Sequence, residues 1–204
     1  MKLYNFPQSI NGRKVESLIK HLGLTIDRHE IDFFGGEMRK PEFLAINPNA
    51  KAPALQDGDM MLWESQAILL YIASLNPSSN LLPTDPKGRA NVDRWLFWNS
   101  SHFEPHIVSL CFEHTLKQML NLGGPNQHFI DAAVANFNKA ATILDSHLKD
   151  NEYVCGGHTV VDYAMYPWCD AAGMGKISFS DYPNIAKWLE RVHQLKGYIP
   201  MPSM

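Results

Sequence analysis

The chain has 204 residues, of which 45% are hydrophobic and 19% are charged, and its formal net charge is −3. A chain of this length buries a substantial core, so we expect it to fold without disulfides or a structural metal. The small negative charge argues against a nucleic-acid-binding protein, which needs a clustered positive surface. No apolar run reaches the roughly 18–20 residues that span a bilayer, so we expect no membrane partner.

The cysteine content and the first residues both favour the cytoplasm. There are three cysteines, an odd number without paired spacing, as expected in a reducing compartment: Cys111, Cys155 and Cys169. We interpret them as small buried hydrophobic residues. The opening residues lack the long apolar core of a signal peptide.

The first part of the chain alternates between strand and helix patterns. Residues 3–6 form a short strand candidate that ends at Pro7. An apolar stripe at helical spacing follows, and Gly23 ends that helix. Residues 25–31 read as a second strand, so the opening is β-α-β, which favours a parallel pair.

A hairpin and another helix complete this first unit. A polar stretch and a short helical turn at residues 41–46 lead to two strands at residues 54–56 and 60–62, which flank the turn dipeptide Asp57-Gly58. A helix then opens at Glu64. This order is that of a thioredoxin-like α/β domain, which we place at residues 1–76.

Beyond a turn-rich linker at residues 77–87, the remaining chain, residues 88–204, reads as an all-α helical domain. Apolar residues at helical spacing mark long helices near residues 92–110, 129–148 and 185–195. Between the last two, Thr159 and Asp162 have the spacing of a capping box.

The chain lacks the cysteine pair of a thioredoxin-like redox protein. Such proteins carry Cys-x-x-Cys where the first strand meets the first helix. Here that place holds Ser9-Ile10-Asn11-Gly12, and no cysteine precedes Cys111. Either the domain is a scaffold without thiol chemistry or its sulfur comes from a bound ligand.

Ala52-Pro53 lies at the entry of the hairpin. Proline at the start of a central strand removes a backbone donor from the ladder. A cis peptide here lets the backbone before it present its N–H and C=O to a peptide-like ligand. The alternative is an ordinary trans proline at an edge or turn.

Glu64-Ser65 opens the helix after the hairpin. A serine at a helix start can direct its hydroxyl and backbone N–H at a carboxylate, with help from the helix dipole. A neighbouring acid would then pair with an amino group of the ligand. The alternative is plain capping, which favours the same residue types.

Together, Ser9, Ala52-Pro53 and Glu64-Ser65 resemble the soluble glutathione transferase family in order and spacing. Residues 47–55 and 62–68 look like the most specific stretch of that family, residues 40–44 fit as well, and the capping box lies where the family has its own. The resemblance covers the whole chain. It implies the glutathione transferase fold, with glutathione as co-substrate and no metal.

The resemblance also implies roles for single residues. Ser9 would donate a hydrogen bond to the glutathione thiolate, with Asn11 as the second candidate for this role. Ala52 would pair through its backbone with the cysteinyl part of glutathione, beside a cis Pro53. Two further roles are implied: Glu64 and Ser65 would hold the γ-glutamyl end, and Lys51 would approach the glycine carboxylate.

Some residues depart from the family pattern. Met38 stands where several classes have histidine, which removes one carboxylate contact that Arg39 or Lys40 would replace. Ala50 and Ala52 replace the more common glycine and a bulkier apolar residue. Asn11-Gly12 is similar to bacterial and fungal relatives in which asparagine contacts the sulfur.

The predicted function is the conjugation of glutathione to small hydrophobic electrophiles in a cleft between the two halves. Its wall is expected to include His102, Phe103 and His106, unless these are helix-surface or core residues. The family's homodimer is expected. Two alternatives remain: a glutathione-dependent peroxidase or disulfide reductase, and a non-catalytic glutathione-binding regulatory protein.

Overall fold

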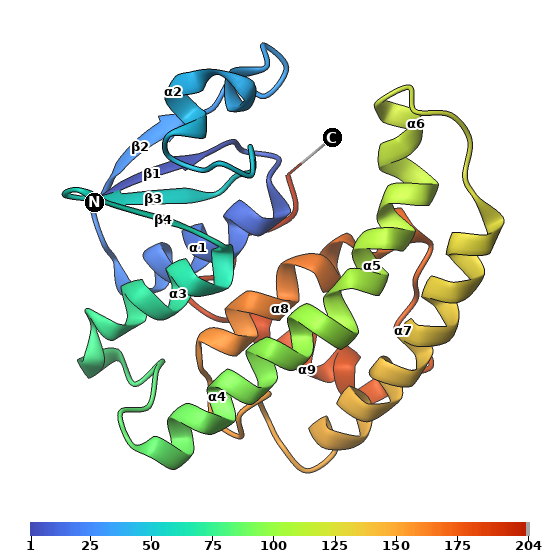
Figure 1. The fold of residues 1–204 in the computed structure, drawn as a ribbon. Helices are drawn as coiled ribbons and strands as arrows, with labels where there is room; N and C mark the ends of the chain where they lie inside the picture. Colours follow the sequence, from blue (N-terminus) through green and yellow to red (C-terminus); the bar gives the residue numbers. More distant parts are fainter. Residues whose placement is uncertain (203–204) are drawn as a thin grey trace.

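The computed structural model describes residues 1–202 and divides the chain into a sheet-containing half and a helical half (Figure 1). The four-stranded sheet has the order β2-β1-β3-β4. Strand β1 (Lys2–Asn5) pairs parallel with β2 (Asp27–Glu30) and antiparallel with β3 (Ala54–Asp57), which pairs antiparallel with β4 (Met60–Trp63). The mixed sheet confirms the thioredoxin-like α/β fold with its parallel β-α-β opening and hairpin.

The two faces of the sheet bury different clusters. Helices α1 (Ile10–Leu22) and α3 (Ser65–Ser74) lie on the face toward the helical half, and the short α2 (Pro41–Leu44) lies on the other (Figure 1). Because successive side chains of a strand point to opposite faces, Leu3 joins the main core while Tyr4 packs edge-on against Phe43 of α2.

The second half is all helical, as the sequence predicts. One long helical run comprises α4 (Pro86–Trp98), α5 (Glu104–Cys111) and α6 (Lys117–Met119), joined by π-helical turns at Asn99–Phe103 and Phe112–Leu116. Helices α7 (Gln127–Leu148), α8 (Val160–Asp170) and α9 (Pro183–His193) follow. The capping box of α8 is present: Thr159 Oγ1 accepts from the first turn and Asp162 accepts from Thr159 N–H at 2.9 Å.

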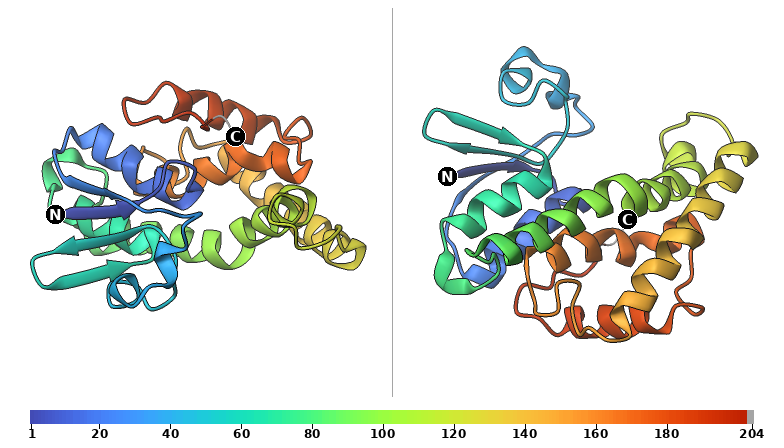
Figure 2. Two further views of the ribbon diagram at one scale, coloured as in Figure 1. Left: turned by 90° about the horizontal axis from the view of Figure 1, so that it is seen from above. Right: turned by 60° about the horizontal axis from the view of Figure 1, so that its bottom comes forward.

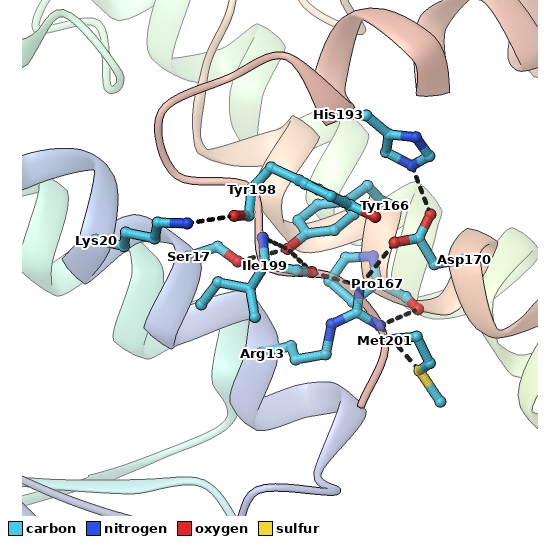
Figure 3. Close-up of polar contacts among 10 residues, drawn as sticks. All are labelled: Arg13, Ser17, Lys20, Tyr166, Pro167, Asp170, His193, Tyr198, Ile199 and Met201. Atoms are coloured by element: carbon cyan, nitrogen blue, oxygen red, sulfur yellow. Dashed lines mark hydrogen bonds and ion pairs between the residues drawn. The ribbon is translucent and has the colours of Figure 1, made fainter. Parts of the chain in front are cut away.

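Helix α1 is packed between the sheet and α8, so it joins the two halves (Figure 2). Its Arg13 is 3% exposed and forms an ion pair with Asp170 of α8 at 2.7 Å. The same guanidinium donates to the carbonyl of Ile199 at 2.9 Å, and Lys20 donates to the carbonyl of Tyr198 at 2.7 Å (Figure 3). The segment after α9 therefore lies against α1.

Within residues 1–202, no helix has the length and apolar character needed to cross a bilayer. The same residues contain no cluster of three or more histidine, cysteine or acidic side chains arranged to hold a metal ion.

Candidate active site

Strand register brings the three predicted segments to one edge of the sheet. Tyr4 of β1 is the partner of Ala54 of β3, and Ala54 is the partner of Trp63 of β4. The residues that follow β1, precede β3 and follow β4 therefore meet at this edge. They lead into Ser9, out of Ala52-Pro53 and into Glu64-Ser65. The same edge carries the first turns of α1 and α3, whose partial positive charges favour an anion.

Ser9 is the N-cap of α1. It is 7% exposed, and its Oγ accepts a hydrogen bond from Gly12 N–H at 3.0 Å. This bond uses a lone pair and leaves the hydroxyl hydrogen available, since Ser9 Oγ donates to no acceptor within the described residues. Ser9 is thus a capped, preoriented donor at the positive end of a helix.

Asn11 lies in the first turn of α1 and lines a cleft between the two halves. Its Oδ1 accepts a hydrogen bond from the indole nitrogen of Trp168 on α8 at 3.0 Å. The contact brings a residue of the helical half to the start of α1. Sequence patterns did not identify Trp168, because it lies in a helix whose residues are nearly all buried.

The Ala52–Pro53 peptide is cis, as the resemblance to the glutathione transferases implies. The loop before it is held by Asn47, which is 2% exposed and donates to the carbonyl of Lys51 at 2.6 Å. Ala50 in this loop has φ of 54°, in the left-handed region that favours glycine. This conformation explains why glycine suits the position and why alanine there is strained.

Glu64 and Ser65 join the end of β4 to the start of α3. Glu64 precedes α3 with φ of 73°, and its side chain forms no capping hydrogen bond. Non-glycine residues held in this region cost about 1–3 kcal/mol and cluster at functional sites. Ser65 is 8% exposed, and its hydroxyl forms no hydrogen bond among residues 1–202. Plain capping therefore does not account for these two side chains.

A cleft of about 730 Å³ lies between the halves, and Asn11, Glu64 and Ser65 are among the residues that line it. Its remaining wall comes from α3, α4, α5 and the two π-helical turns, and most of it is apolar: Ala67, Leu70, Leu96, Phe97, Pro105, Val108 and Phe112. Polar side chains that also line it are Gln66, Asp93, Ser100, Glu104 and Ser109.

The lysines expected near the glycine end lie outside this cleft. Lys40 is exposed immediately before α2, and Lys51 is exposed in the loop before Pro53. Ser9, Ala52 and Pro53 are adjacent to the cleft along the sheet edge but do not line it.

The residues expected in the electrophile wall are placed differently. Phe103 is 1% exposed and stacks between Trp98 and Phe137 in the core. Neither His102 nor His106 lines the cleft. Phe103 keeps the regular helical spacing of Val92 and Leu96, which are also buried, so it belongs to the core stripe of this helical run. Glu104, Val108 and Phe112 line the cleft instead.

A largely buried ion pair links α1 to the cleft wall at Glu104. Lys14 on α1 is 1% exposed, and its Nζ lies 2.7 Å from both carboxylate oxygens of Glu104. Asn99 donates to the same carboxylate at 2.6 Å. An amphipathic reading of α1 could not identify this pair, because it places lysine on the solvent side.

Family models match both halves of the chain. The model described as "Glutathione S-transferase, N-terminal domain" matches residues 1–74, and "Glutathione S-transferase, C-terminal domain" matches residues 103–196.

Individual relatives match nearly the whole chain. Glutathione S-transferase 3 of Zea mays is 31% identical and covers 99% of this chain and 96% of its own. A glutathione S-transferase structure from Pseudomonas fluorescens Pf-5 has a TM-score of 0.88 at 30% identity, covering 99% and 98%. The URE2P6 transferase of Phanerochaete chrysosporium, solved with oxidised glutathione, has a TM-score of 0.85 at 25% identity, covering 96% and 91%. The chain belongs to the glutathione S-transferase family and is an enzyme that conjugates glutathione.

Proposed function

We propose that glutathione lies along the shared sheet edge, with its sulfur at the start of α1 and its γ-glutamyl end at the start of α3. The observation that carries this proposal is the common cleft of Asn11, Glu64 and Ser65. The electrophile then occupies the apolar remainder of the cleft. This wall suits small hydrophobic electrophiles because burial of apolar surface supplies the main attraction.

The sulfur is activated by hydrogen bonds to its anion. A free thiol has a pKa of about 8.5, so only a few per cent is thiolate at neutral pH. The Ser9 hydroxyl donates to the thiolate, the Asn11 amide is a second donor, and the α1 dipole adds to both. A drop of two units is worth about 2.7 kcal/mol and makes most of the bound thiol reactive. A neutral donor suffices, because its role is electrostatic.

The remaining groups hold the tripeptide. The Ser65 hydroxyl and the first N–H groups of α3 bind the γ-glutamyl carboxylate, and Glu64 pairs with the adjacent amino group. The backbone of Ala52, beside the cis Pro53, pairs with the cysteinyl unit. Lys40 and Lys51 are the cations proposed for the glycine carboxylate.

The test is a calorimetric glutathione titration followed by assays of conjugation and reduction. We expect saturable binding and activity with a chloronitrobenzene. No saturation at millimolar tripeptide contradicts the proposed site. Activity with a hydroperoxide or a disulfide alone identifies a glutathione-dependent peroxidase or reductase instead. Binding without turnover of any of these substrates identifies a non-catalytic regulatory protein.

We further propose a cytoplasmic homodimer with domains at residues 1–76 and 88–204, joined by a linker at 77–87. Support for the dimer comes from large apolar side chains left exposed on β4 and just after α3: Met61, Trp63 and Leu75. Light scattering after gel filtration tests it, and the mass of a single chain contradicts it.

A further inference from the structure

We propose that Trp168 is a positioning residue for the transfer reaction: it locks the Asn11 amide so that its NH2 group points to the sulfur. The inference rests on the proposed function, in which Asn11 donates to the thiolate. Trp168 is 7% exposed on α8, and its indole nitrogen lies 3.0 Å from Asn11 Oδ1. The helical half thereby reaches the sulfur-binding end of the other half.

Hydrogen-bond chemistry fixes the orientation of this amide. An indole N–H only donates, so the atom of Asn11 that faces it must be the oxygen. The NH2 group then occupies the opposite arm and forms no hydrogen bond with any residue from 1 to 202. A reversed amide would place NH2 against the indole N–H and present an acceptor to the sulfur anion. The contact with Trp168 therefore fixes the orientation in which the Asn11 NH2 group faces the sulfur.

The distance between Asn11 and Trp168 is itself held by their neighbours. Arg13, two residues after Asn11, donates to the carbonyl of Pro167 at 3.4 Å and pairs with Asp170 at 2.7 Å. These contacts join α1 to α8 at Pro167 and Asp170 (Figure 3), which flank Trp168 in the sequence. Because the two helices are joined at these flanking positions, the indole has little freedom to leave the amide.

The inference predicts that Trp168→Phe raises the pKa of bound glutathione. The change keeps an aromatic ring and removes the N–H, so the amide is free to turn. We expect a rise of at least about half a unit, seen by thiolate absorbance, and about a threefold loss of kcat/KM at pH 6. The loss should vanish at pH above both thiol pKa values, and the KM for glutathione should change less than twofold.

Other charges around the cleft stay constant in this comparison. The titratable side chains that line it are Glu64, Asp93 and Glu104, the last paired with Lys14.

Trp188→Phe is the matched control, because the Trp188 indole N–H donates to Asp162 at 2.8 Å in the interior of the helical half. The control should lower stability and leave the thiol pKa unchanged. An equal pKa rise in both variants would overturn the inference.

Asn11 variants separate this inference from the proposed function. If Asn11→Ala leaves the thiol pKa unchanged, the proposed role of Asn11 fails, and the inference with it. If Asn11→Ala raises the thiol pKa and Trp168→Phe does not, only the inference about Trp168 fails. In the Asn11→Ala background, Trp168→Phe should add no further rise, and an undiminished rise overturns the inference. Asn11→Asp keeps the acceptor for Trp168 and offers the sulfur an oxygen, so it should raise the thiol pKa more than Asn11→Ala does. A smaller rise in Asn11→Asp would contradict the inference that the Asn11 NH2 group faces the sulfur.

Discussion

The Lys14 ammonium lies 2.7 Å from both carboxylate oxygens of Glu104 and joins α1 to α5 at the cleft wall. Removing one partner leaves the other charge buried and unpaired, which costs about 3–5 kcal/mol. We therefore expect Glu104→Ala to lower the free energy of unfolding by about that amount, measured by urea denaturation. The double variant Lys14→Met with Glu104→Leu should recover most of the loss. An additive loss in the double variant would contradict the coupling.

Ser9→Ala should lower turnover strongly and leave glutathione affinity nearly unchanged. The variant loses a donor to the thiolate, so the thiol pKa should rise by about one unit and kcat/KM at pH 6.5 should fall about tenfold. Losing the bond from Gly12 N–H also costs about 1 kcal/mol of stability. Ser9→Thr keeps the hydroxyl and is the control. Full activity in Ser9→Ala would move the role to Asn11.

Ser65→Ala should mainly weaken glutathione binding. A hydrogen bond to a charged carboxylate is worth about 1.5–3 kcal/mol, so the dissociation constant should rise at least tenfold in calorimetry. Ser74→Ala on the same helix is the control, because the Ser74 hydroxyl bonds only its own helix at Tyr71. An unchanged dissociation constant in Ser65→Ala would show that the γ-glutamyl end lies elsewhere.

Ala50→Gly should stabilise the protein. Alanine at φ of 54° is strained by about 1–2 kcal/mol, which exceeds the entropy that glycine adds to the unfolded chain. We expect a net gain of about 0.5–1 kcal/mol in thermal or urea unfolding. Ala45→Gly is the control: Ala45 has an ordinary helical φ of −67°, so glycine there should destabilise. If Ala50→Gly and Ala45→Gly lower the free energy of unfolding by similar amounts, Ala50 is not strained.

Histidine burial predicts an acid-sensitive fold. Burial, with a smaller effect from His21, lowers the pKa of His158 to about 4, while an unfolded histidine titrates near 6.5. Between these values the unfolded chain binds more protons, so stability falls as pH drops from 6.5 to 4, by up to about 3 kcal/mol. The ring neighbours of His158 are His21, Tyr153 and Tyr163.

The measurement is unfolding free energy against pH. His158→Phe should flatten the slope in this window, and the exposed His128→Gln should not. The same slope in all three proteins would contradict the assignment to His158.

Local signals were enough to predict the sheet half. The Asp57-Gly58 turn and the Gly23 stop act through contacts only a few residues apart, so the sequence displays them directly. In the helical half, the Thr159–Asp162 box is equally local. The same holds for the placement of Ala52-Pro53 and Glu64-Ser65, because strand pairing alone brings them together.

The cleft wall could not be predicted in this way. Regular helical spacing already puts Phe103 on the buried stripe with Val92 and Leu96. Which other face of this helical run turns toward α1 and α3 is set by packing between distant segments, so the sequence does not show that Glu104 lines the cleft. The Trp168 contact joins residues 157 positions apart, and nothing in either local sequence announces it.

Helix α1 belongs to the sheet-containing half by chain order, but two of its charged side chains are buried against the helical half. Its Arg13 and Lys14 find their counter-ions in Asp170 and Glu104, beyond the linker. In a chimera that joins the first half to the helical half of another transferase, Arg13 and Lys14 would be buried without counter-ions unless that helical half has acids at the positions of Asp170 and Glu104. Recombination between relatives is thereby limited to partners that carry matching acids at these two places.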